Sequence, residues 1–348
     1  MVKFDPRSSK IVYATRIGGS GWDAAFRVVV DVRGRVWVSG TTQSADFPFK
    51  NAERRHSDQG AINAFVARLD RDGAVEDMAL VGDATGEGLV VTPDGTAYLT
   101  GTKAPSEEKH YAYVAEIRER GSPRLLTIGP GTASGVAVDK RGFLFAAGFD
   151  GRGAFVARVQ LSAWTMVTLR SIGSADGDRA RDVAIDGSGR PHVLGTAVSP
   201  DFCPKRSLAG KSDIFVAGFD ADLSRSTYCV SFGGSADDLA GFNGGSLKID
   251  SQNKLWLSGS TRSPDLKAQG RFAGLDDALV VSCTPGCRQF RLASYFGGEG
   301  FELFEGLALA PDGSVWTIGL TSSKSLTASG HHGGRSDAIL VKWTNESK

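Results

Sequence analysis

The chain has 348 residues and a formal net charge of +1, so its overall charge predicts neither a nucleic acid nor an anionic membrane as partner. Its 45 glycines and 41% hydrophobic residues are typical of a turn-rich β protein, and no apolar run approaches the ~18 residues of a membrane-spanning helix. Length alone would allow two domains, but an internal repeat outweighs that expectation.

The first predicted strand lies in IVYATRIGG, residues 11–19. The same pattern ends later repeats, for example TYCVSFGG at residues 227–234, and residues 2–4 match residues 341–343. We therefore expect residues 1–19 to complete the last repeat, which would close a circular array without an open sheet edge. Residues 1–6 have neither the basic segment nor the apolar core of a signal peptide, which keeps a cytoplasmic location open.

Residues 28–40, VVVDVRGRVWVSG, predict two antiparallel strands joined by a tight turn. Copies recur in one register, with a turn residue such as Asp31 nine positions before the closing glycine and an aromatic residue such as Trp37 three positions before it. His192 takes the aromatic place in the fourth copy, and we expect it to be a packed core ring. The predicted hairpins span residues 28–40, 89–101, 136–148, 183–195, 247–259 and 307–319.

Two further strands follow each hairpin. In the first repeat they read NAFVARLD, beginning at Asn63, and MALVG, which follows a short turn. The other third strands begin at Tyr111, Gly153, Asp213, Asp277 and Asp337. The sequence therefore predicts an all-β fold, a six-bladed β-propeller of four-stranded antiparallel blades, as one domain over residues 1–348.

These motifs resemble those of the SBBP family of bacterial β-propeller repeats. The matching segments are YATRIGGSGWD at residues 13–23, VVVDVRGRVWVSGTT at 28–42, SADFP at 44–48 and GRSDA at 334–338. The resemblance covers nearly the whole chain and is weakest in the second and third repeats, which lack the DFP segment. It implies a propeller that is secreted, periplasmic or at the cell surface. The matching chain ends also suggest a structural module of a larger surface protein.

In such a blade, the turns between strands 1 and 2 and between strands 3 and 4 lie at one end. The 2–3 loops and the connections between blades lie at the other end, and their variable length makes that end the predicted functional face. Carboxylates recur there at the start of the innermost strands, at Asp23, Asp178, Asp238 and Glu302. A ring of them around a channel mouth would suit calcium. The alternative, which the recurrence favours, is that each one accepts backbone hydrogen bonds and holds a loop.

Four histidines fall in the 2–3 segments of neighbouring repeats, namely His56, His110, His331 and His332. Converging imidazoles beside a carboxylate would suit zinc. The alternative is that these are ordinary surface histidines, since they share no fixed spacing. Calcium and zinc are therefore the two candidate cofactors.

Basic and aromatic residues share the same loops. Arg27, Arg179 and Arg181 lie at the innermost strands, and arginine forks match carboxylates and sulfates. Trp22 and Phe242 would suit contact with a sugar or a peptide, or would pack between blades. We expect Trp22, Asp23, Arg27, Asp178, Arg181, Asp238, Phe242 and Glu302 to form the binding face.

No motif with catalytic geometry, such as GxSxG or HExxH, is present. The leading hypothesis is therefore a propeller that binds a glycan or a protein partner. The alternative is an enzyme, a polysaccharide lyase or a metal-dependent hydrolase, that uses Asp178, Asp238 or Glu302 as acid or base.

Four cysteines are too few for a disulfide scaffold in a chain of this length. Cys283 and Cys287 flank a predicted turn. They would either pair in an oxidising compartment or remain thiols.

Overall fold

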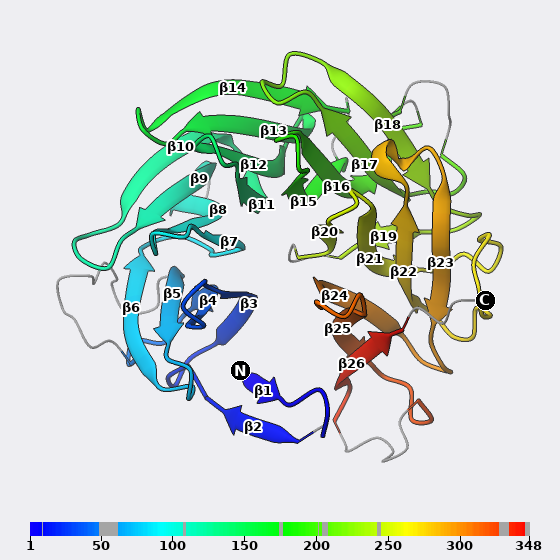
Figure 1. Ribbon diagram of the computed structural model, residues 1–348, viewed down its shortest axis with the longest axis horizontal. Coiled ribbons are helices and arrows are strands. Elements are labelled where there is room, and N and C mark those ends of the chain that lie inside the picture. Colours follow the sequence, from blue (N-terminus) through cyan, green and yellow to red (C-terminus); the bar gives the residue numbers. More distant parts are fainter. Residues whose placement is uncertain are drawn as a thin grey trace. The chain divides into compact units, whose positions relative to one another are not determined.

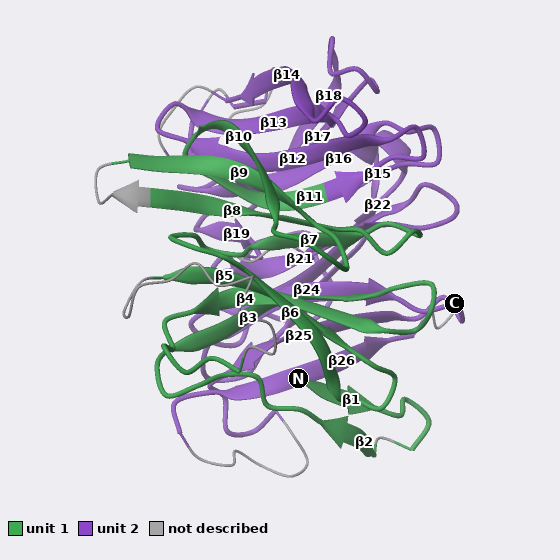
Figure 2. Cartoon of the chain, turned by 90° about the vertical axis from the view of Figure 1, so that its left-hand side faces the viewer, with its two compact units in different colours: residues 1–136 green, residues 137–348 purple. Residues whose placement is uncertain are grey.

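The computed structural model describes residues 1–8, 10–48, 62–106, 109–173, 177–200, 202–203, 208–241, 245–326 and 334–344. The chain divides into two compact units, Met1–Val136 and Ala137–Lys348 (Figure 2). Strands joined by turns make up both units, and the described residues include one short 3-10 helix, η2 (Pro285–Cys287). Within the described ranges, no helix is long and apolar enough to cross a membrane.

Unit 1 contains an N-terminal strand pair and two blades (Figure 1). The pair consists of β1 (Val2–Phe4) and β2 (Ile11–Ala14). Blade 1 consists of β3 (Asp23–Val30), β4 (Val36–Thr42), β5 (Asn63–Leu69) and β6 (Val75–Val81). Blade 2 consists of β7 (Gly88–Val91), β8 (Ala97–Ser106), β9 (Lys109–Ile117) and β10 (Arg124–Pro130). In both blades the strands pair antiparallel in chain order.

Blades 3 to 6 follow, and the boundary between the units falls within the first strand of blade 3. Blade 3 consists of β11 (Thr132–Val138), β12 (Phe143–Asp150), β13 (Gly153–Gln160) and β14 (Thr165–Ile172). Blade 4 consists of β15 (Arg179–Ile185), β16 (Pro191–Ala197), β17 (Asp213–Phe219) and β18 (Ser226–Phe232). In blade 5, β19 (Asp238–Ala240) and β20 (Leu247–Ile249) both pair with β21 (Leu255–Thr261), followed by β22 (Asp277–Cys283) and β23 (Phe290–Phe296). Blade 6 consists of β24 (Glu302–Leu309), β25 (Val315–Thr321) and β26 (Asp337–Trp343).

These strands confirm the predicted fold class, an all-β six-bladed β-propeller of four-stranded antiparallel blades. The predicted hairpins form in register, with Val28 opposite Val38 in blade 1 and Val183 opposite Val193 in blade 4. The N-terminal strand β2 pairs with β1, and the described part of blade 6 has three strands. Completion of blade 6 by residues 1–19 and the single domain over residues 1–348 stay predictions.

In four of the six hairpins, an aspartate at the start of the turn holds it. In blade 1, Asp31 Oδ1 accepts the amide hydrogens of Arg33 and Arg35, both at 2.9 Å. Gly34, in the same turn, has φ 77°, a conformation that glycine adopts without steric cost. The amides of the corresponding turns donate in the same way to Asp139, Asp186 and Asp250. We call this end of each blade the turn end and the opposite end the loop end.

The closing glycine of the hairpin allows the two inner strands to approach. A Cβ on Gly195 would lie 2.1 Å from the carbonyl oxygen of Arg179 and 2.5 Å from the Phe215 ring. Any side chain there would force backbone apart, which explains why the position is glycine in each hairpin.

The hydrophobic core of unit 2 includes a layer between blades 3 and 4. Phe145 and Val156 of blade 3 pack with Val193 and Phe215 of blade 4, and all four are buried. Each such side chain contributes roughly 1.5–3 kcal/mol on burial. This packing holds blade 4, on which the candidate site lies, against blade 3.

Candidate functional site

The recurring carboxylates at the loop end each hold a loop. Asp178 is fully buried, and its Oδ1 accepts the amide hydrogens of Val198 at 2.8 Å and Ser199 at 3.0 Å. Its Oδ2 accepts the Ser199 hydroxyl at 2.5 Å. Asp178 therefore ties the start of the 2–3 loop to the connection that precedes β15.

Asp238 and Glu302 repeat this arrangement in blades 5 and 6. Asp238 accepts the Gly234 amide at 2.8 Å, the Ser263 hydroxyl at 2.9 Å and the Thr261 hydroxyl. Burial raises the pKa of Asp238 above its ordinary value, although these hydrogen bonds oppose the shift. Both side chains are fully buried.

The partners of Glu302 are the Gly298 amide at 2.8 Å and the Thr321 hydroxyl at 2.6 Å. In unit 1, Asp23 accepts the Gly19 amide and the Ser44 hydroxyl, both at 2.8 Å. The hydrogen bonds support the structural alternative for all four carboxylates. A direct role for them in ligand binding, calcium binding or acid–base catalysis stays a prediction that this geometry does not favour.

The loop end of blade 4 has a pocket of about 310 Å³ next to the Asp178 loop. Two of its residues, Arg179 and Arg181, lie on β15, and their guanidinium carbons are 4.5 Å and 5.7 Å from the centre of the Phe149 ring. Phe149 comes from β12 of blade 3, so blade packing supports the arginines by cation–π contact. We call this the loop-end pocket.

A β-bulge contributes to this arrangement. The pairing of β15 with β16 shifts between Ala180 and Asp182, so Arg181 is the extra residue of the bulged strand. Bulges re-aim a side chain and are common next to functional sites. Equivalent shifts occur around Phe26 in β3 and around Glu305 in β24. The bulge is therefore part of the repeated scaffold, and the blades differ in the type of residue that occupies it.

The loop-end pocket carries a positive charge. Lys211 joins the two arginines, and the pocket includes one carboxylate, Asp237. Asp237 accepts the Ser212 hydroxyl at 3.1 Å and lies 3.8 Å from the Arg262 guanidinium. Arg262 also forms two hydrogen bonds with Asp276, so it offsets the charge of Asp237 only in part. The pocket favours an anion because three cations line it against one carboxylate.

The remaining predicted binding residues do not join this pocket in the described structure. Trp22, Asp23 and Arg27 belong to unit 1, where the Trp22 side chain is 54% exposed. Phe242 lies outside the described residues.

The predicted metal ligands are mostly not described. His56, His331 and His332 lie outside the described residues, and His110 is an exposed residue of β9. Across the described ranges, no three histidine, cysteine, aspartate or glutamate side chains are grouped to hold a metal ion. The zinc and calcium sites stay predictions.

All four cysteines form disulfides. Cys283 pairs with Cys287 across the turn that contains η2, as one of the two alternatives expected. Cys203 pairs with Cys229 of β18, a link between residues 26 positions apart that the sequence did not indicate.

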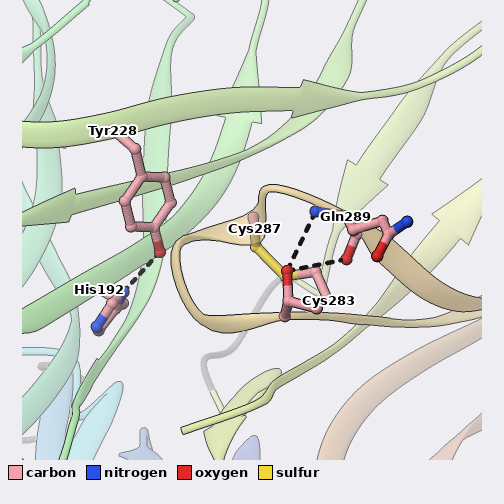
Figure 3. Close-up of a disulfide and its surroundings, with 6 residues drawn as sticks. His192, Tyr228, Cys283, Cys287 and Gln289 are labelled. Carbon is pink, nitrogen blue, oxygen red and sulfur yellow. Dashed lines mark hydrogen bonds between the residues drawn. A yellow bond between two sulfur atoms is a disulfide. The ribbon is translucent and has the colours of Figure 1, made fainter.

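Sequence reasoning missed a second pocket, at the turn end between blades 4 and 5. His192 is 6% exposed, as a core ring should be, but it also lines a pocket of about 410 Å³. Its Nδ1 lies 2.6 Å from the Tyr228 hydroxyl, next to the turn that the Cys283–Cys287 disulfide closes (Figure 3). Pro285, Gly286 and Arg288 of that turn form another wall of the pocket. The available signal was histidine at a place where the other repeats have Trp, Tyr or Phe.

Comparisons with known proteins identify no family. No protein-family model and no curated protein matches this sequence. A similar solved structure is the GH43 β-xylosidase/α-arabinofuranosidase CoXyl43 from a compost microbial metagenome, in complex with xylotriose in a calcium-free form. It shares 14% identity and a TM-score of 0.42 with this chain, over 80% of this chain and 99% of the other. A likeness at this level says nothing of activity.

Proposed function

We propose that this protein is a binding module whose loop-end pocket recognises an acidic glycan. The observation that carries the proposal is the set of three cations, Arg179, Arg181 and Lys211, around one pocket. Guanidinium groups bind carboxylates and sulfates through paired hydrogen bonds, and these groups distinguish acidic polysaccharides from neutral ones.

The supporting geometry is rigid. Arg179 and Arg181 lie on a strand within a packed blade and contact the Phe149 ring, so little side-chain freedom would be lost on binding. The pocket wall at Val198 is held by Asp178. The recurring carboxylate thus serves the site by positioning its loop.

We also propose that the protein functions in an oxidising compartment, outside the cytoplasm. The two disulfides, Cys203–Cys229 and Cys283–Cys287, support this location because such bonds persist mainly in exported proteins. The resemblance to SBBP repeats points the same way and rests on sequence motifs. Titration of free thiols in the protein denatured without reductant should find none.

The test compares trigalacturonate with the neutral cellotriose by isothermal titration calorimetry. We expect binding of trigalacturonate that weakens with added salt, and a loss of about tenfold or more in the Arg179→Ala variant. Arg225→Ala is the matched control, because Arg225 is a 79% exposed arginine of the same blade, paired with Asp220 in a turn. Equal affinity for both trisaccharides, or unchanged affinity in Arg179→Ala, would contradict the proposal.

A further inference from the structure

At the turn end, blade 4 departs from the repeat at three neighbouring positions. Where the other hairpins have an aromatic ring, blade 4 has His192. His192 pairs with Gly218 on the third strand, and Gly218 pairs with Tyr228 on the fourth strand. The other third strands have Arg68, Glu116, Arg158, Ser282 and Lys342 at this point. Among the described fourth strands, the equivalents of Tyr228 are Asp77, Arg124, Thr168 and Leu292.

The three departures depend on one another. A Cβ on Gly218 would lie 2.1 Å from Cε1 of Tyr228, so the tyrosine ring crosses the third strand only because residue 218 is glycine. The ring then brings its hydroxyl to 2.6 Å from Nδ1 of His192. One of these three residues alone would not produce this contact, whereas the three together do.

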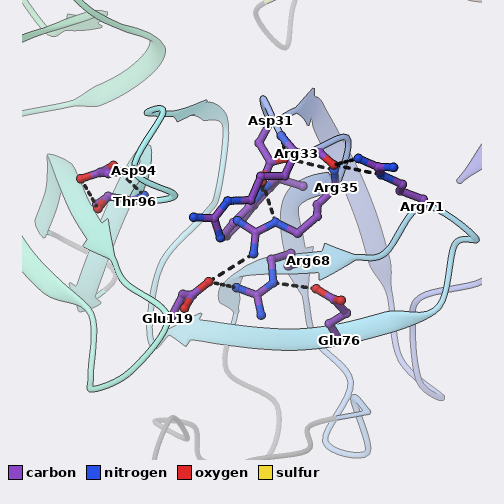
Figure 4. Close-up of polar contacts among 10 residues, drawn as sticks. Asp31, Arg33, Arg35, Arg68, Arg71, Glu76, Asp94, Thr96 and Glu119 are labelled. Carbon is purple, nitrogen blue, oxygen red and sulfur yellow. Dashed lines mark hydrogen bonds and ion pairs between the residues drawn. The ribbon is translucent and has the colours of Figure 1, made fainter.

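Blade 1 shows which side chains occupy the corresponding turn-end positions in another repeat. The guanidinium carbons of Arg35 and Arg68 lie 5.7 Å and 5.5 Å from the centre of the Trp37 ring. Both arginines also reach Glu119 at 3.1 Å (Figure 4). Side chains thus cover the turn end of blade 1, while the same positions of blade 4 line a pocket of about 410 Å³.

The hydrogen bonds determine which proton His192 carries. Asp186 Oδ1 accepts two turn amides, and its Oδ2 accepts Arg190 Nε at 3.0 Å and lies 3.4 Å from Nε2 of His192. A carboxylate only accepts, so the proton of a neutral His192 is on Nε2 and the Nδ1 lone pair accepts the hydroxyl hydrogen of Tyr228. Burial lowers the pKa of His192 and raises that of Tyr228, which keeps both groups neutral at pH 7.

This arrangement sets the chemistry that the pocket offers. The Tyr228 hydroxyl donates to His192, so it meets a ligand as an acceptor, which suits a ligand hydroxyl. Arg190 and Arg288 supply positive charge, and Arg190 already pairs with Asp186. Asn253 accepts the Gly187 amide through Oδ1, which leaves its nitrogen as a donor. A group that accepts a hydrogen bond from a ligand hydroxyl, next to an arginine, would suit a sugar that carries an anionic group.

We infer that the turn-end pocket between blades 4 and 5 is a second ligand site, which binds a monosaccharide carrying a carboxylate or a phosphate through Tyr228 and Arg288. Its volume falls within the range of about 300–1,000 Å³ typical of small-molecule sites. The site is on the opposite end of blade 4 from the acidic-glycan site and does not depend on it.

The test measures binding of D-glucuronate, D-glucose 6-phosphate and D-glucose by calorimetry. We expect at least one anionic sugar to bind at least tenfold more tightly than glucose, and the tighter of the two identifies carboxylate or phosphate as the group recognised. Arg288→Ala should remove this preference. Tyr228→Phe, which keeps the ring, should weaken binding about fivefold to tenfold because one hydrogen bond is lost.

Two further variants separate the site from the scaffold. His192→Trp restores the residue of the first repeat, where the Trp37 indole donates to the turn aspartate. It removes the Nδ1 acceptor of the Tyr228 hydroxyl and adds bulk at the pocket wall, so it should abolish binding while the blade stays folded. Tyr98→Phe is the control, because Tyr98 is a turn-end tyrosine of blade 2 whose hydroxyl lies 3.5 Å from Glu116. Histidine side-chain ¹⁵N spectra should show the Nδ1 signal of His192 shifting when the sugar is added. Absence of binding by all three sugars, or wild-type affinity in Tyr228→Phe, would overturn the inference.

Discussion

Blade 4 has a pocket at each end, and the two pockets share one construction. At the loop end, the recurring Asp178 holds the backbone, and the residues particular to this blade, Arg179 and Arg181, line the pocket. At the turn end, the recurring Asp186 holds the turn, and the particular residues are His192 and Tyr228. The loop-end pocket is strongly cationic, whereas the turn-end pocket combines a neutral hydrogen-bonded pair with arginine.

The comparison teaches where to seek function in a repeat protein. Residues that recur in register satisfy the backbone needs that every repeat shares, such as closing a turn or tying a loop. Residues that depart from the residue type of the repeat at neighbouring positions have no such common purpose. The acidic residues that looked like a binding ring belong to the first class, and His192 belongs to the second.

The largest expected effect concerns the two disulfides of this region. Replacing Cys203 and Cys229 together by serine should cost roughly 3.5 kcal/mol of unfolding free energy, because the bond closes a loop of 26 residues. The bond between Cys283 and Cys287 spans 4 residues and should contribute roughly 2 kcal/mol, but its loss should weaken ligand binding at the turn end. Denaturant unfolding of both double variants checks the order, and equal losses would contradict it.

Removing a recurring carboxylate should damage stability. Asp178→Ala would leave the Val198 and Ser199 donors buried without their acceptor, at a cost of about 3 kcal/mol. Asp72→Ala, an exposed turn residue, is the control and should change stability by less than about 0.5 kcal/mol. A stable Asp178→Ala protein with altered glycan affinity would reverse the assignment and return this carboxylate to the binding site.

Two recurring carboxylates, Asp31 at the turn end of blade 1 and Asp238 at the loop end of blade 5, should respond to acid with opposite sign. Burial opposes ionisation of Asp31, but hydrogen bonds from Trp37 and Arg35 lower its pKa from 3.8 to about 2. Its folded-state pKa is depressed, so its stabilisation is present above pH 4 and is lost as the pH falls from about 4 to about 2. The loss should be at most about 2 kcal/mol.

For Asp238 the folded-state pKa is raised, so the folded state binds the proton more tightly and stability increases as the pH falls towards 4. Denaturant unfolding between pH 2 and pH 7 should therefore show a shallower acid limb in Asp31→Asn and a shallower slope above pH 4 in Asp238→Asn. The same pH profile in both variants would remove the distinction between these two carboxylates.

The smallest expected effect is on the stability of a variant in the turn-end pocket. Arg288 is exposed and follows η2, so Arg288→Ala should change the unfolding free energy by less than about 0.5 kcal/mol. Its thermal unfolding should match that of the wild-type protein even though the preference for an anionic sugar is lost. A large destabilisation would place Arg288 among the scaffold residues instead.

Most of the fold could be predicted because its signals are local. Alternation along β3 and β4 and the turn chemistry of Asp31 with Gly34 lie within a few residues, and the same signals recur in six hairpins. The structural role of Asp178 was among the alternatives for the same reason. A carboxylate that recurs at the same place beside a recurring loop is expected to hold that loop by hydrogen bonds.

What the tertiary structure decided concerns residues brought together across strands. The disulfide from Cys203 to Cys229, the contact of Phe149 with Arg179, and the meeting of His192 with Tyr228 over Gly218 depend on strand register, a bulge and blade packing. No local pattern encodes such neighbours, because residues 192 and 228 are 36 positions apart and a shift of one residue in either strand would separate them. The sequence alone determined the blades, and only their packing determined the two pockets.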